Sequence, residues 1–383
     1  MGRDFYRLPC CIMRGGTSKG IFLKKNHLPA DPAKRDAAIL EIFGSPDVRQ
    51  IDGLAGADPL TSKLAIIGPA SRPDADVDYT FAQVSIDRPF VDFNGNCGNI
   101  SSAVGPYAIN EGLVAVTEPV TRVRIHNTNT GKLLVADVPV RDGLAAVQGD
   151  CKIDGVPGTG AEILMDFSDT LGSATGKLLP TGKPLDRMET SRGTIEVSIV
   201  DVANPTVFVR AADVNMLGTE TPKEINGNAE LLTFLEEIRG RAAVLCGMAA
   251  SPEEALAKSP AFPMLAFVTP PKDYTDFTSG KTIAAGQVDM VSRLMYMQVL
   301  HKTYAGTGTC CTGAAMKIPG TIAYEATPGA ADKTVLRIGH PAGVINVHVQ
   351  FEDGKLTRCA FARTARRIMD GYVYLRDARG ESR

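Results

Sequence analysis

FNGNCGNISSAV at residues 93–104 and YAGTGTCCTGAAM at residues 304–316 are the most informative stretches of this sequence. In each stretch, glycines that can take a positive φ are followed by Ser, Thr and Ala, small residues that suit a helix packed on all sides. We therefore expect a buried helix to begin in each stretch. Because one stretch lies in each half of the chain, we expect a duplicated architecture.

Each half also contains a polar loop that follows a strand. These loops are MRGGTSKG at residues 13–20 and VANPT at residues 202–206. On this interpretation each half supplies one loop and one helix start, and the active site lies between the halves.

Length and composition support a globular protein of two domains. The 383 residues exceed the usual size of one domain, and the 44% hydrophobic and 22% charged residues are ordinary values. The net charge of -2 gives no reason to expect a nucleic acid or an anionic membrane as partner. We expect one domain at 1–188 and another at 189–364, and leave open whether 365–383 completes the first. A homodimer is one assembly that the sequence allows.

The N-terminal residues 1–7 lack a basic stretch followed by an apolar run, and no later stretch is apolar for long enough to span a membrane. A cytoplasmic protein with reduced cysteines is therefore expected. The five histidines lie far apart, without the spacing of a metal site, and no nucleotide-binding glycine motif occurs. We expect neither a metal nor another cofactor.

Short runs rich in Val, Ile, Thr and Phe, separated by Gly and Pro, predict many strands. Candidate strands are 122–125, 133–138, 194–200, 206–210, 335–338 and 344–351. Apolar residues at spacings of three and four predict helices at 32–43, 228–245 and 252–258. Most of the regular structure is thus expected to be β.

A helix start can bind an anion because its free N–H groups and its dipole both favour negative charge. Two such starts could hold two carboxylates of one substrate, although ordinary tight turns are the alternative. The residues concerned are Asn94, Gly95, Asn96, Gly98 and Asn99 in the first stretch and Gly306, Thr307 and Gly308 in the second.

Two residues are candidates for proton transfer. Cys97 lies in the first helix start, where a thiol can be activated, but a buried packing role is the alternative. Lys63 precedes an apolar strand, where partial burial would favour its neutral form, and a surface lysine is the alternative. A further set of residues can donate hydrogen bonds to a substrate carboxylate, with a structural role as the alternative. These residues are Arg14, Thr17, Ser18, Asn204 and His301.

These motifs, RGGTSKG at 14–20, NGNCGN at 94–99, Asn204-Pro205, His301-Lys302 and Thr307-Gly308, resemble those of the PrpF-like isomerases. The resemblance extends over nearly the whole chain. It implies the α+β fold of diaminopimelate epimerase, in which two similar domains each wrap a curved, mostly antiparallel sheet around a central helix. The active site then lies in the cleft between them.

In the epimerases each helix start carries a cysteine, whereas this chain keeps Cys97 but has Ala305 at the second position. A racemase with two thiols is therefore not expected. The resemblance implies instead that Lys63 supplies the second proton-transfer group.

The function expected from these observations is a 1,3-allylic proton shift in a small unsaturated di- or tricarboxylate. Lys63 is the expected base, and Cys97 a second acid/base. Overall likeness favours 4-oxalomesaconate as substrate, with 2-methylaconitate or 3-methylitaconate as alternatives. A cysteine-nucleophile enzyme and a non-catalytic carboxylate-binding protein are the alternatives outside this class.

Overall fold

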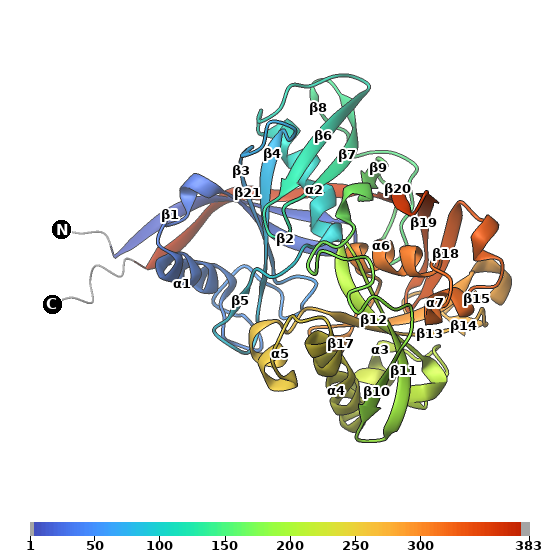
Figure 1. Cartoon of the computed structure of the whole chain (residues 1–383). Coiled ribbons are helices and arrows are strands. Elements are labelled where there is room, and N and C mark those ends of the chain that lie inside the picture. The colour runs from blue at the N-terminus through green and yellow to red at the C-terminus, as the bar shows by residue number, and fades with distance from the viewer. Residues whose placement is uncertain (1–3, 377–383) are drawn as a thin grey trace.

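A computed structural model describes residues 4–376 of the chain (Figure 1). The first half is built mainly from strands around two helices, α1 (Pro32–Phe43) and α2 (Gly98–Asn110). Its strands are β1 (Phe5–Gly15), β2 (Ser18–Lys24), β3 (Lys63–Pro69), β4 (Val77–Val84), β5 (Val91–Asp92), β6 (Val120–Asn127), β7 (Lys132–Arg141), β8 (Leu144–Ala145) and β9 (Ile163–Asp166).

The second half repeats this mixture of strands and helices. Its strands are β10 (Asp186–Thr190), β11 (Gly193–Val202), β12 (Asn204–Arg210), β13 (Met264–Thr269), β14 (Tyr274–Thr275), β15 (Thr282–Ile283), β16 (Met290–Tyr296), β17 (Val299–Leu300), β18 (Val335–His340), β19 (Gly343–Glu352), β20 (Lys355–Arg363) and β21 (Ala365–Arg376). Its helices are α3 (Pro222–Asn226), α4 (Ala229–Leu245), α5 (Pro252–Lys258), α6 (Gly306–Ala315) and α7 (Ile322–Glu325).

The predicted elements are confirmed. All six candidate strands lie within β6, β7, β11, β12, β18 and β19, and the three candidate helices correspond to α1, α4 and α5. Local signals explain this accuracy: Asp31 and Ser251 cap α1 and α5 through their side chains, and each helix has proline in its first turn.

The two stretches of small residues form the central helices α2 and α6. Every residue of α6 is buried, and every residue of α2 except Asn110 is buried as well. Helix α2 contacts β1, β2, β3, β6, β7 and β21, whereas α6 contacts β11, β12, β18, β19 and β20. Figure 1 shows the two helices near the middle of the molecule, where they also contact each other.

The polar loops become tight turns of two antiparallel hairpins. In the first, Gly15 pairs with Ser18 across Gly16 and Thr17, and in the second, Val202 pairs with Asn204 across Ala203. Gly16 and Ala203 both have positive φ, at 51° and 62°. Each half therefore brings one hairpin turn and one helix start toward the middle of the chain's fold.

Strand β21 returns to the start of the chain and pairs with β1 from Phe5 to Gly15. Residues 377–383 of the C-terminal segment lie outside the described residues. The expected boundary at residue 188 falls within β10, which pairs with β11. Strand β20 pairs with both β9 and β19, so hydrogen bonds run continuously between the halves. The two-domain division stays a prediction.

Within residues 4–376, no helix combines the length and apolar character needed to cross a membrane.

The contact between α2 and α6 leaves no room for a side chain at its centre. A methyl carbon on Gly98 would lie 2.7 Å from the backbone nitrogen of Thr307, so Gly98→Ala should lower the free energy of unfolding by about 1–3 kcal/mol. Urea unfolding measures this loss. Gly286→Ala is the control, because nothing lies within 4 Å of its added carbon. Equal stability of the two variants would contradict the close contact.

Candidate active site

The starts of α2 and α6 face each other in direct backbone contact. Gly98 is the first residue of α2 and Gly306 the first of α6, and added Cβ atoms on either would collide with the other's backbone. Neither N-cap residue, Cys97 or Ala305, makes a side-chain cap hydrogen bond. The fold thus brings together two helix starts without side-chain caps, and each of them can stabilise a negatively charged group.

Asn204, from the second hairpin, links the two helix starts. Its Nδ2 donates to the carbonyl of Asn96 at 2.7 Å and to Oγ1 of Thr307 at 2.8 Å. Its Oδ1 accepts from the backbone N–H of Asn96 at 3.2 Å. These three residues, predicted as site residues, are therefore brought together and buried.

Lys63 is the first residue of β3 and is only 2% exposed. Its Nζ donates to Oε1 of Gln83 at 2.8 Å and lies 4.7 Å from the ring centroid of Tyr296. Burial lowers the pKa of the lysine ammonium, and interactions with Cys97 and Asp58 oppose that shift. A lysine held in this way can exist as a neutral amine, which is able to accept a proton.

Two residues beside Lys63 were missed from the sequence, Gln83 and Tyr296. Gln83 is oriented because its Nε2 donates to the carbonyls of Pro59 and Ser62, which turns Oε1 toward the lysine. Oε1 also accepts from the Tyr296 hydroxyl at 3.0 Å, and burial raises the pKa of that phenol well above its usual value. A polar residue in the otherwise apolar end of β4 was the available signal for Gln83.

His301 also lies beside Lys63, and its imidazole is neutral and can donate a hydrogen bond. Burial, followed by the charge of Lys63, lowers its pKa to about 3. Because its Nδ1 accepts from the backbone N–H of Thr303 at 3.2 Å, the ring proton is on Nε2. We call Lys63, Gln83, Cys97, Tyr296 and His301 the Lys63 cluster. All but Gln83 line one small cavity with the helix starts.

The first hairpin turn contributes residues of different kinds. Ser18 is buried, and its Oγ has no hydrogen-bond partner among residues 4–376. Thr17 Oγ1 accepts from Thr303 at 2.8 Å, and its backbone N–H donates to Oδ1 of Asn99 at 3.4 Å. Arg14 instead holds the turn, because its Nη1 donates to the carbonyls of Gly16 and Thr364.

The remaining predicted residues have packing or anchoring contacts. The Asn94 side chain is turned away and donates to the carbonyl of Lys258, and Asn99 donates from Nδ2 to the carbonyl of Tyr304. Gly95 makes room for the ring of Phe262, and Gly308 for Leu294. Among residues 4–376, His, Cys, Asp and Glu side chains do not gather in groups of three that could hold a metal.

The family described as PrpF protein matches residues 5–376, which is nearly the whole chain. The chain belongs to the PrpF family. It is an isomerase of that family.

Two relatives illustrate the range of named substrates. The chain is 67% identical to 3-methylitaconate isomerase from Eubacterium barkeri, over 98% of this chain and 99% of the relative. It is 40% identical to (4E)-oxalomesaconate Delta-isomerase from Novosphingobium sp. strain KA1, over 97% and 99% of the two chains.

Solved structures agree with this assignment. A crystal structure of methylitaconate-delta-isomerase has a TM-score of 0.80 and 67% identity, covering 98% of this chain and 97% of that one. A hydroxyproline epimerase from Agrobacterium vitis has a TM-score of 0.57 at 14% identity, covering 99% and 95%. The fold is therefore a mixed α/β fold shared with epimerases of this kind.

The contact between Gln83 and Lys63 can be tested by adding a charge. Gln83→Glu places a carboxylate beside Nζ, which favours the protonated amine and should raise the pKa of Lys63 toward 10.5. NMR titration of the lysine ¹³Cε signals measures this pKa, and the loss of one signal in Lys63→Met assigns it. Gln350→Glu, on an exposed part of β19, should leave the Lys63 signal unchanged. An unchanged pKa in Gln83→Glu would exclude a direct interaction.

Proposed function

We propose that this isomerase catalyses a 1,3-allylic proton shift in 3-methylitaconate or a closely similar unsaturated dicarboxylate. The observation that supports this most is the 67% identity to a 3-methylitaconate isomerase over almost the full length of both chains. The 40% identity to an oxalomesaconate isomerase gives weaker support to 4-oxalomesaconate. The comparison therefore favours the alternative substrate over the one first expected from the sequence.

The proposed first step uses Lys63 as the base. Its neutral amine takes the proton from the carbon next to one carboxylate, and the electrons of that C–H bond form a new double bond. The original C=C electrons move toward the terminal methylene carbon. Burial that lowers the pKa of the ammonium supports this role, because a general base works best with a pKa near the working pH.

The proposed second step returns a proton to the methylene carbon, which becomes a methyl group. The product is then a 2,3-dimethyl-substituted butenedioate, which requires no oxidant. Cys97 interacts with Lys63 and lies at the N-cap of α2, which makes its thiol the proposed donor. Transfer of a proton from the Lys63 ammonium to the Cys97 thiolate then restores both groups for the next turnover.

The negative charge of the intermediate needs fixed donors. The uncapped starts of α2 and α6, the free hydroxyl of Ser18 and the Nε2–H of His301 are the proposed donors. Asn96, Asn204 and Thr307 hold the helix starts together, and Asn99 lines the same cavity.

We further propose that the halves form two epimerase-like domains with this site between them. Helices α2 and α6, each packed against its own set of strands, support that division.

Substrate choice can be measured directly. Purified protein should convert 3-methylitaconate with a kcat/KM at least about tenfold above that for 4-oxalomesaconate, a difference of about 1.4 kcal/mol in transition-state binding. NMR of the products reports both reactions. A preference for 4-oxalomesaconate would restore the substrate that the sequence first suggested and reject the present proposal.

The roles of Lys63 and Cys97 can be separated by exchange in deuterated water. Lys63→Met keeps an apolar stem but cannot accept a proton, so exchange at the abstracted carbon should fall by about 10²-fold to 10⁴-fold. Cys97→Ser should reduce exchange less, because its hydroxyl can still donate to the intermediate. Normal exchange in Lys63→Met with complete loss in Cys97→Ser would make the thiolate the base.

A further inference from the structure

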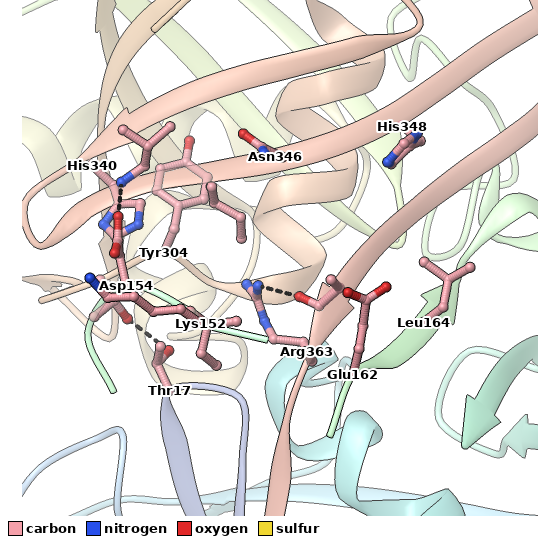
Figure 2. A pocket seen from close by; sticks show the side chains of 15 residues that line it. Thr17, Lys152, Asp154, Glu162, Leu164, Tyr304, His340, Asn346, His348 and Arg363 are labelled. Carbon is pink, nitrogen blue, oxygen red and sulfur yellow. Dashed lines mark hydrogen bonds between the residues drawn. The ribbon is translucent and has the colours of Figure 1, made fainter. Parts of the chain in front are cut away.

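A second polar cavity, of about 280 Å³, lies beside the Lys63 cluster. Figure 2 shows it between Thr17, Lys152, His340 and Arg363, with the guanidinium of Arg363 among the lining side chains. It shares no lining residue with the small cavity at the helix starts. We call it the Arg363 cavity.

Arg363 is a buried cation without a carboxylate partner. The residue is 4% exposed, its Nε donates to Oδ1 of Asn99 at 2.9 Å, and its Nη1 donates to the carbonyl of Ala362 at 3.0 Å. The guanidinium also lies 4.6 Å from the ring centroid of Phe361. Within residues 4–376 it forms no ion pair, and Nη2 has no hydrogen-bond acceptor.

A buried guanidinium without an ion-pair partner is a favourable place for an anion to bind. Buried charges in proteins are normally paired, since an unpaired charge loses its hydration without compensation. Burial lowers the pKa of Arg363 to about 10, which still leaves the guanidinium protonated at neutral pH. A ligand with a carboxylate could supply the missing acceptor at Nη2, in the geometry that arginine favours.

Two neutral donors line the same cavity. His340 Nδ1 accepts from the backbone N–H of Ala342 at 3.2 Å, so its proton is on Nε2. Burial, then the charge of Arg363, lowers the pKa of this histidine to about 3, which keeps it uncharged. Thr17 accepts from Thr303, so its own hydroxyl hydrogen remains available.

The outer wall carries charges of both signs. Lys152 and Glu162 are exposed, and Asp154 is half-buried. Asp154 is already used, because its Oδ2 accepts from the backbone N–H of Val344 at 2.8 Å. The inner wall therefore favours an anion, whereas the rim carries two carboxylates and one ammonium group.

Asn99 separates the Arg363 cavity from the Lys63 cluster. Its Oδ1 accepts from Arg363 and from the Thr17 backbone, and its Nδ2 donates to the carbonyl of Tyr304 at 3.2 Å. It also belongs to the first turn of α2, two residues after Cys97. A ligand on Arg363 would thus contact a residue that is hydrogen-bonded directly to the helix start.

We propose that the Arg363 cavity is a second binding site, separate from the Lys63 cluster, for a small carboxylate held by Arg363, His340 and Thr17. This goes beyond the proposed isomerisation, since the site is expected to bind its ligand without chemical change. The volume suits a ligand of a few carbon atoms, and malonate is the probe for the tests.

Isothermal titration calorimetry should detect malonate binding to the wild-type protein. Arg363→Leu should weaken it by at least about tenfold, the loss of about one charge-assisted hydrogen bond. Arg358→Leu is the matched control on the same strand, because Arg358 pairs with Asp166 and does not line the cavity. Equal affinity in the wild-type and Arg363→Leu proteins would overturn the proposal.

A second variant guards against misfolding of Arg363→Leu. Thr17→Val keeps the shape of the side chain but removes the hydroxyl donor, and it should weaken malonate binding several-fold. Unchanged binding in a folded Thr17→Val protein would remove Thr17 from the site, and with it the proposed donor set.

A competition experiment separates this site from the substrate site. Malonate is titrated into protein saturated with an equilibrated mixture of 3-methylitaconate and its isomer, and it should still bind with similar affinity. Loss of malonate binding under these conditions would show that Arg363 belongs to the substrate site, and would reject a separate one. Failure of isomerase activity, by contrast, would leave malonate binding intact and reject only the proposed function.

Discussion

The backbone contact between Gly98 and Gly306 is the constraint on which the rest of the structure depends. Two helix starts can approach this closely only where neither carries a side chain at the point of contact. The positive ends of the two helix dipoles then lie next to each other, and their repulsion is unfavourable unless it is compensated. Asn204 compensates part of this repulsion by hydrogen bonding to both helix starts, and a bound anion would compensate the remainder.

Two cationic side chains, Lys63 and Arg363, are buried in this part of the molecule. The two residues line different cavities, and neither forms an ion pair with a carboxylate of residues 4–376. The lysine can relieve the cost by losing its proton, whereas arginine holds its proton far more strongly. The two cations therefore suit different tasks, proton transfer for one and anion binding for the other.

The sequence predicted what depends on neighbouring residues. The bounds of α1 and α5 and the beginnings of α2 and α6 follow from proline, capping residues and runs of small residues. It could not show that Gln83 meets Tyr296, since these residues are 213 positions apart and meet only through tertiary packing. The Arg363 contact with Asn99 spans 264 positions and was missed for the same reason. Asn94 was expected in the site because its neighbours are there, but its side chain turns toward Lys258.

The pairing of β1 with β21 has a consequence for how the chain is made. The residues of β21 that pair with Phe5–Gly15 of β1 are synthesised at least 350 residues after their partners. During that interval one edge of β1 has no partner, and an unpaired edge is a template for wrong pairing. At the usual rate of about 5–20 residues per second, this exposure lasts on the order of tens of seconds. The free edge of β1 in a nascent chain is thus open to pairing with other strands until β21 has been made.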